Sequence, residues 1–205
     1  MKVLHFPANI ASQISVTVQA LRGLGVDARG LVLGNHAIQD PTGIELLPTP
    51  QLRRRQWLRK RVQRWMTRRA ICSAIRWADV VHWYYSWALP NAYDVKYAAK
   101  LGKAGLVEFW GSDIRIPRIA SIGNPYMANM YRDHPDIEKD NDRMSYMRQR
   151  IFAQQGMACL IPGPDIWSCV DASSFPDPYS TFARIKMNEF SASYPEANKR
   201  RPCVV

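Results

Sequence analysis

Polar side chains gather directly after an apolar stretch in the middle of the chain, where residues 107–115 read VEFWGSDIR. Ser112, Asp113 and Arg115 bring a hydroxyl, a carboxylate and a guanidinium within four residues. A carboxylate can accept a proton or a hydrogen bond from a hydroxyl, and a guanidinium can bind a phosphate. Gly111 would let a ligand approach the backbone closely, because it has no Cβ. This stretch is therefore the first candidate for a chemical site.

Two other stretches have the same form, with polar and aromatic residues where an apolar strand is expected to end. They read PANIASQ over residues 7–13 and HWYYSW over residues 82–87. Aromatic faces beside hydrogen-bonding groups suit sugars, whose C–H faces are apolar and whose hydroxyls need partners. The sequence therefore predicts a substrate-binding set made of Asn9, Ser12, Gln13, His82, Tyr84, Trp110, Gly111, Ser112 and Arg115.

Structural interpretations compete with this site. Gly-Ser-Asp is also an ordinary turn, in which Ser112 or Asp113 caps the following helix. His82 could be a core histidine, or could support the site without touching a ligand. The aromatic run over residues 83–87 could simply pack against the end of the sheet. The residue types alone leave these alternatives open.

The elements that would position these residues alternate between strand and helix. Apolar stretches predict strands over residues 2–6, 27–33, 44–47, 79–83, 106–110 and 158–161. Helical spacing predicts a helix that Ser12 caps and Gly23 and Gly25 close, one or two helices over 52–78, and further helices over 91–102, 125–134 and 136–155. Nearly all-apolar strands that alternate with helices indicate an α/β fold, a Rossmann-like parallel sheet with helices on both faces. Ligands of such sheets lie beyond the carboxyl ends of the strands.

The net charge of +11 comes from one segment. Residues 53–76 hold ten Lys or Arg and no Asp or Glu, whereas 18 basic residues face 17 acidic ones elsewhere. Leu58, Val62, Trp65 and Met66 form an apolar stripe within this segment, and from Ala70 onward the segment is apolar enough to be core. The first part predicts an interfacial helix on an anionic membrane, with the contact residues Arg53, Arg54, Arg55, Trp57, Arg59, Lys60, Arg61, Arg64, Trp65, Arg68 and Arg69.

Two alternatives for this basic segment stay open. Arginines could bind phosphates and tryptophans could stack on bases, which would make it a nucleic-acid surface. It could also be a solvated helix that packs on an acidic neighbour. We expect the membrane interaction in preference to nucleic acid, because tryptophan suits the headgroup zone of a bilayer.

Length and composition exclude several classes of protein. No apolar run is long enough to span a bilayer, and the N-terminal MKVLHFPAN lacks a signal-peptide pattern. We therefore expect a cytoplasmic protein that could associate with the inner face of the cell membrane. The four cysteines form no C-x-x-C pair or zinc pattern, so no metal is expected. No G-x-G-x-x-G follows the first strand, which argues against a dinucleotide oxidoreductase.

Four motifs, in order, resemble the N-terminal half of a GT-B-type glycosyltransferase of the group that makes bacterial cell-surface polysaccharides and glycolipids. MKVLHFPAN resembles the opening strand and loop of that family, and ADVVHWYYSW resembles its "D-V-V-H-x-H" strand. VEFWGSDIR resembles its "H-G-S-D-I-R" stretch, and ACLIPGPDIW resembles a later strand and helix. The resemblance covers about the whole chain. It implies an acceptor-side domain over residues 1–197, with residues 198–205 as a linker and the start of a second, donor-binding domain.

The resemblance also implies a reaction. The domain would help to transfer a sugar from a nucleoside-diphosphate sugar, as co-substrate, to a glycan or lipid-linked acceptor. The second domain of the family carries an E-x7-E motif and holds most of the donor, so this chain alone is expected to be inactive. Backbone donors and positive side chains, and no bound metal, would stabilise the leaving diphosphate. The alternative function is a non-catalytic module that binds membrane or RNA through residues 52–69.

Two positions depart from the family pattern. The first loop, residues 7–13, has no glycine, although Asn9, Ser12 and the following helix N-terminus could still meet a phosphate. The histidine that precedes Gly-Ser-Asp in the family is Trp110 here. Tryptophan can stack on a sugar but cannot exchange a proton, so the catalytic role is assigned to Asp113.

Overall fold

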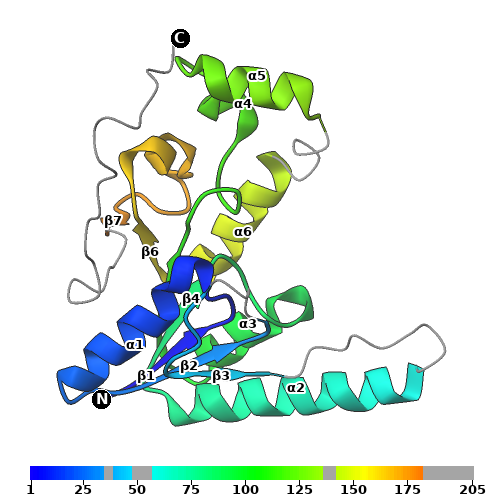
Figure 1. Cartoon of the computed structure of the whole chain (residues 1–205), viewed down its shortest axis with the longest axis vertical. Coiled ribbons are helices and arrows are strands. Elements are labelled where there is room, and N and C mark those ends of the chain that lie inside the picture. Colours follow the sequence, from blue (N-terminus) through cyan, green and yellow to red (C-terminus); the bar gives the residue numbers. More distant parts are fainter. Residues whose placement is uncertain (35–38, 48–56, 136–141, 182–205) are drawn as a thin grey trace, which may run out of the picture.

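A computed structural model of the chain describes residues 1–34, 39–47, 57–135 and 142–181 (Figure 1). In these ranges every strand pairing is parallel, and one sheet has the order β3-β2-β1-β4-β5-β6-β7. The strands are β1 Lys2–Phe6, β2 Asp27–Val32, β3 Ile44–Leu46, β4 Val80–Tyr84, β5 Ala104–Glu108, β6 Ala158–Ile161 and β7 Tyr179–Ser180. The helices are α1 Gln13–Gly23, α2 Trp57–Trp77, α3 Tyr93–Lys100, α4 Pro117–Ala120, α5 Pro125–Asp133 and α6 Asp142–Gln154. Short 3-10 turns cover Ile10–Ser12, Pro90–Ala92 and Pro164–Cys169.

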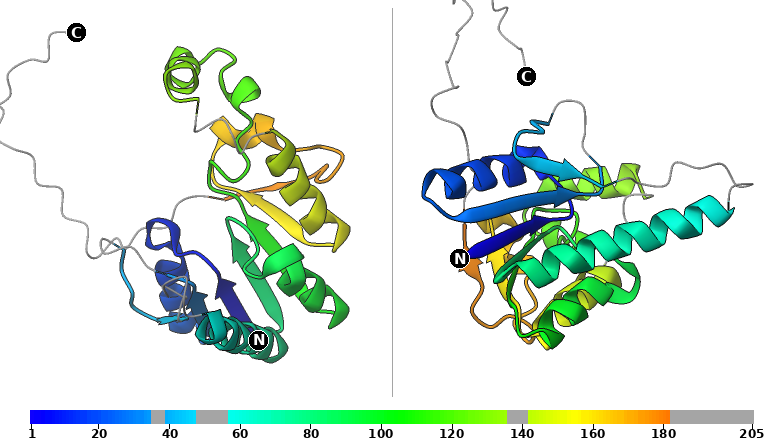
Figure 2. Two further views of the ribbon diagram at one scale, coloured as in Figure 1. Left: turned by 90° about the vertical axis from the view of Figure 1, so that its right-hand side faces the viewer. Right: turned by 90° about the horizontal axis from the view of Figure 1, so that it is seen from below.

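This architecture confirms the expected Rossmann-like α/β fold, with helices on both faces of the sheet (Figure 2). Alternate side chains of each strand point to opposite faces, so two separate cores form. Val3 and Tyr84 join Ile14 and Val18 of α1 in one core. Leu4, Phe6, Val81, Trp83 and Val107 join residues of α2, α3 and α6 in the larger core, with Ile71, Ile75, Val95, Ala98 and Phe152 among them.

Close packing of α1 on the sheet depends on Gly30 in β2. A Cβ at Gly30 would lie 2.8 Å from Ile14 Cγ2 and 2.6 Å from Ile44 Cγ2, which is too close for real atoms. The glycine therefore lets Ile14 of α1 and Ile44 of β3 approach β2 closely.

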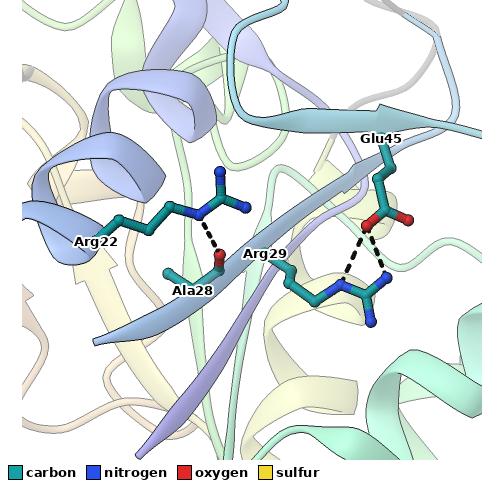
Figure 3. A network of polar contacts seen from close by, with 4 residues as sticks. All are labelled: Arg22, Ala28, Arg29 and Glu45. Atoms are coloured by element: carbon teal, nitrogen blue, oxygen red, sulfur yellow. Dashed lines mark hydrogen bonds and ion pairs between the residues drawn. The ribbon is translucent and has the colours of Figure 1, made fainter. Parts of the chain in front are cut away.

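Polar contacts at the edge of the sheet tie β2 to its neighbours (Figure 3). The Arg22 Nε donates to the Ala28 carbonyl at 2.8 Å, which links the end of α1 to β2. Arg29 Nη2 of β2 lies 2.6 Å from Glu45 Oε1 of β3. Both side chains of that ion pair are substantially exposed, so it contributes at most about 1 kcal/mol to stability.

The basic segment forms one continuous helix over Trp57–Trp77. Ile71, Ala74 and Ile75 are buried, which confirms that the second half belongs to the core. The first half of α2 extends beyond the sheet (Figure 2). Arg53, Arg54 and Arg55 lie outside the described residues, and so do the expected linker and domain start at 198–205. Within the described ranges, every helix is too short or too polar to cross a lipid bilayer.

Candidate functional site

The carboxyl ends of β1, β4 and β5 lie side by side, because these three strands are neighbours in the sheet. The chain leaves β1 toward β2 on one side, whereas β4 and β5 lie on the other side, so the strand order reverses between β1 and β4. Ligands of open parallel sheets bind at such a reversal. The three polar stretches therefore meet at one edge, as the sequence predicted.

Strained backbone gathers at the same edge. In the described part of the chain, positive φ angles at non-glycine residues occur at Ala11, Ser12, Tyr85, Asn91 and Ala92, all in the connections after β1 and β4. Such a conformation costs of order 1–3 kcal/mol per residue, and it persists where the surrounding structure enforces it. Strain of this kind concentrates at ligand-binding sites, so its position agrees with the strand reversal.

The loop after β5 is organised by the carboxylate of Asp113. Its Oδ1 accepts hydrogen bonds from the backbone N–H of Trp110 at 3.1 Å and of Gly111 at 2.6 Å. Asp113 is fully buried, and Arg148 Nη1 of α6 donates to its carbonyl oxygen at 2.9 Å. Neither Ser112 nor Asp113 caps a helix, since α4 begins at Pro117 with Ile116 at its N-cap. Asp113 therefore holds this loop in shape from the inside.

Burial raises the pKa of Asp113 to about 6, because the charged form loses its hydration. The N–H groups of Trp110 and Gly111 and the charge of Arg148 act in the opposite direction and limit the rise. A pKa near 6 suits a general base, but this carboxylate points into the protein. Its catalytic assignment stays a prediction, and its visible role is to position the loop.

Four side chains of this edge have access to solvent and lie together. The hydroxyls of Tyr85 and Ser112 are 3.2 Å apart, and the guanidinium of Arg148 lies 5.8 Å from the centre of the Tyr85 ring. The Arg115 guanidinium packs over Gly111, where a Cβ would lie 3.4 Å from its Nη1. We call Tyr85, Ser112, Arg115 and Arg148 the edge cluster. It offers two hydroxyls, two cations and an aromatic face.

The first loop uses its predicted ligand groups internally. Asn9 is buried, and its Oδ1 accepts hydrogen bonds from the N–H groups of Ile14 and Ser15 at 3.1 and 3.3 Å. Asn9 therefore caps α1, and the expectation that Ser12 does so is wrong, because the Ser12 Oγ accepts from the Asp40 N–H instead. The helix N-terminus proposed for a phosphate is thus already occupied by Asn9.

Gln13 is also buried in this first loop, and its Nε2 donates to the Ala11 carbonyl at 3.2 Å. Asn9, Ser12 and Gln13 therefore make hydrogen bonds within the first loop or to Asp40, and these bonds shape the loop.

His82 and Tyr84 lie within β4 and not beyond it, because the strand extends to Tyr84. Both are buried, and their rings stack with centroids 4.2 Å apart. His82 Nε2 lies 3.1 Å from Glu108 Oε2 of β5, and the Tyr84 hydroxyl donates to Thr17 at 3.3 Å. The position of His82 therefore agrees better with the alternative of a core histidine than with a ligand-binding role.

Trp110 is the remaining predicted ligand residue, and its ring is half-buried beside the core under α1. Its indole N–H is buried and has no hydrogen-bond partner among the residues that the structure describes. Sequence reasoning missed Tyr85 and Arg148. Tyr85 directly follows the predicted Tyr84. The two residues differ in role because β4 ends at Tyr84, which is buried, and Tyr85 lies in the loop beyond the strand. Arg148 lies 35 residues beyond Asp113 on α6, so no local pattern could have linked the two.

The described basic residues of α2 lie away from the edge cluster on a separate surface. Arg59, Arg61, Arg64, Arg68 and Arg69 are exposed, Lys60 is partly exposed, and Trp57 and Trp65 are each more than half exposed. Arg61 lies over Trp57, and Arg69 lies over Trp65. These contacts keep the tryptophan rings beside cations at the surface.

No family model matches this chain, and no curated protein resembles it closely enough to count as a relative.

Proposed function

We propose that this chain is the acceptor-side domain of a GT-B-type glycosyltransferase. Joined to a donor domain, it would transfer a hexose from a nucleoside-diphosphate sugar to a glycan or lipid-linked acceptor. The observation that carries the proposal is the edge cluster, which lies where the strand order reverses and beside strained backbone. The motif resemblance supports the choice of family, and the edge cluster supports this position for the site.

Each member of the edge cluster has a role in this reaction. The Tyr85 and Ser112 hydroxyls suit hydrogen bonds to sugar hydroxyls, and the Tyr85 ring suits an apolar sugar face. Arg115 and Arg148 supply positive charge for a leaving diphosphate. Asp113 fixes the loop that carries Ser112 and Arg115, and Trp110 borders the cluster. No step of this scheme requires a metal ion.

The proposal has a direct genetic test. The coding sequence after Val205 should continue in frame into a second Rossmann-like domain with an E-x7-E motif. An open frame that encodes a domain of another kind would contradict the assignment of this chain to a GT-B enzyme.

We also propose that α2 places the enzyme on the anionic inner face of the cell membrane. Leu58, Val62 and Met66 are each more than half exposed and recur at every fourth residue, so they form one stripe along the helix. This outer stripe lies on the side of α2 opposite to the buried Ile71 and Ile75. The flanking arginines would gain about 1 kcal/mol each near an anionic surface.

The paired substitution Leu58→Gln and Val62→Gln should weaken binding to phosphatidylglycerol-containing vesicles by about tenfold or more, because it removes the apolar contact and keeps the charge. Vesicle co-sedimentation measures this. The matched control is Leu24→Gln with Ile122→Gln, two exposed residues on other elements, which should bind like the wild type. Equal binding by both paired variants would contradict an apolar contact through α2, and tighter binding to RNA than to vesicles would favour the nucleic-acid alternative.

A further inference from the structure

A groove of about 810 Å³ separates the middle of α2 from the segment that follows β4. It lies on the side of α2 that faces the protein, whereas the outer stripe faces away. Arg64 and Arg68 of α2 line one wall, and Lys96 of α3 lines the other. Leu33, Ala88 and Leu89 line the groove between them. The volume falls in the range of small-molecule sites, which is roughly 300–1,000 Å³.

The groove is cationic, and its lining includes no acidic side chain from the part of the chain that the structure describes. Arg64 and Lys96 form no ion pair with any residue of the described ranges. Arg68 is held in place, because its guanidinium lies 4.0 Å from the centre of the Tyr93 ring. Three positive groups around one opening, with no carboxylate among the described lining residues, favour an anionic ligand.

The acidic residue nearest in sequence to the wall points away from the groove. Asp94 is fully buried and accepts hydrogen bonds from the backbone N–H groups of Ala88 and Leu89, both at 3.0 Å, and from the Trp83 indole at 2.9 Å. These bonds fix the wall that includes residues 88–91. The strained φ of +58° at Asn91, which lines the groove, belongs to the same rigid turn.

Apolar side chains adjoin the cations. Leu33, Leu89 and Pro90 line the groove, and so does Trp65, whose side chain is more than half exposed. A hydrocarbon chain whose phosphate met Arg64, Arg68 and Lys96 could therefore cover these carbons. A bare phosphate would leave them in water.

We propose that this groove binds the phosphate group of a single phosphate-bearing amphiphile, with its hydrocarbon chain against Leu33, Leu89 and Pro90. Binding here is saturable and one-to-one, unlike the diffuse attraction of α2 to a charged surface. It is also independent of the glycosyl transfer proposed above, since it requires neither the edge cluster nor a donor domain.

The test uses dihexanoyl phosphatidic acid below its micelle threshold, titrated into the purified chain in a calorimeter. One-to-one binding is expected. Inorganic phosphate and dihexanoyl phosphatidylcholine should each bind at least about tenfold more weakly, since one lacks the chains and the other carries a compensating cation. Inorganic phosphate that binds as tightly as the phosphatidic acid would overturn the assignment to an amphiphile, as would the absence of saturable binding.

Two paired variants with the same change of charge locate the site. Arg64→Gln with Lys96→Gln should weaken the binding of dihexanoyl phosphatidic acid by about tenfold or more. Arg76→Gln with Lys100→Gln removes one cation from each of the same helices outside the groove, and should change it by less than about twofold. An equal loss of affinity for dihexanoyl phosphatidic acid in both paired variants would overturn the assignment of the site to this groove. It would indicate a general effect of charge. We expect both variants to fold, because all four side chains are exposed. Thermal melting followed by circular dichroism checks this.

Discussion

Asp94→Ala should lower the free energy of unfolding by about 2–4 kcal/mol. This is the largest effect that we expect from the substitution of a single buried polar residue. The substitution leaves the Trp83 indole and the N–H groups of Ala88 and Leu89 buried without their acceptor. Each such donor costs roughly 1–3 kcal/mol, and removal of a buried charge offsets part of the sum. Burial raises the pKa of Asp94, because the charged carboxylate loses its hydration in the folded protein. Urea unfolding followed by circular dichroism measures the change.

Asp94→Asn should lose less stability than Asp94→Ala, since the amide keeps one acceptor oxygen. Asp133→Ala is the matched control, because Asp133 is exposed and, among the described residues, forms an ion pair with the neighbouring Arg132 alone. We expect that control to stay within about 0.5 kcal/mol of the wild type. A similarly small change for Asp94→Ala would contradict the role of this carboxylate in the wall of the groove.

Asp113 should give the protein a measurable loss of stability as the pH rises from about 4 to 6. The pKa of Asp113 is about 6 in the folded protein and about 3.9 in the unfolded chain. A raised pKa favours the protonated form in the fold, so the contribution to stability is complete below pH 4, falls as the pH rises, and is lost above pH 6. Two pKa units correspond to about 2–3 kcal/mol.

Comparison with Asp113→Asn isolates this effect. The amide is neutral at every pH and can still accept the N–H bonds of Trp110 and Gly111. The difference in unfolding free energy between wild type and variant should therefore shift by about 2–3 kcal/mol between pH 4 and pH 7, in favour of the variant at pH 7. Asp113→Ala, in contrast, should destabilise the protein at both pH values, because two buried donors lose their acceptor. If the difference in unfolding free energy between the wild type and Asp113→Asn did not change with pH, that result would contradict a raised pKa for the buried carboxylate of Asp113.

The strands were predictable because their apolar character comes directly from burial on both faces. β1 and β6 match the predicted ranges, β2 and β3 end one residue before theirs, and β4 begins and ends one residue after its predicted range. β5 was placed two residues too late, over 106–110, because Phe109 and Trp110 are apolar but follow the strand. Even a one-residue error matters at an edge. β4 ends at Tyr84, so Tyr84 points into the core and Tyr85 carries the exposed hydroxyl.

Long-range polar partners were beyond the reach of sequence patterns. Ser12 stands directly before α1 and has the usual residue type for a cap, yet the strained turn before the helix brings Asn9 into that role. Arg148 lies on α6, 35 residues after Asp113, and only the tertiary fold brings it to the loop of Asp113. The groove beside α2 likewise depends on how residues 64–68 and 88–96, which are distant in sequence, meet in the fold.

Transfer of radiolabelled sugar by the complete gene product tests the central proposal most directly. Membranes from cells that express it would be supplied with a panel of nucleoside-diphosphate sugars, and label would be counted in the lipid and glycan fractions. The account predicts transfer from at least one donor. Arg115→Gln should lower kcat/KM by about 100-fold, and Arg132→Gln, an exposed arginine on α5, should leave it within about twofold. No transfer from any donor, or full activity in Arg115→Gln, would contradict a glycosyltransferase that works through this edge of the sheet.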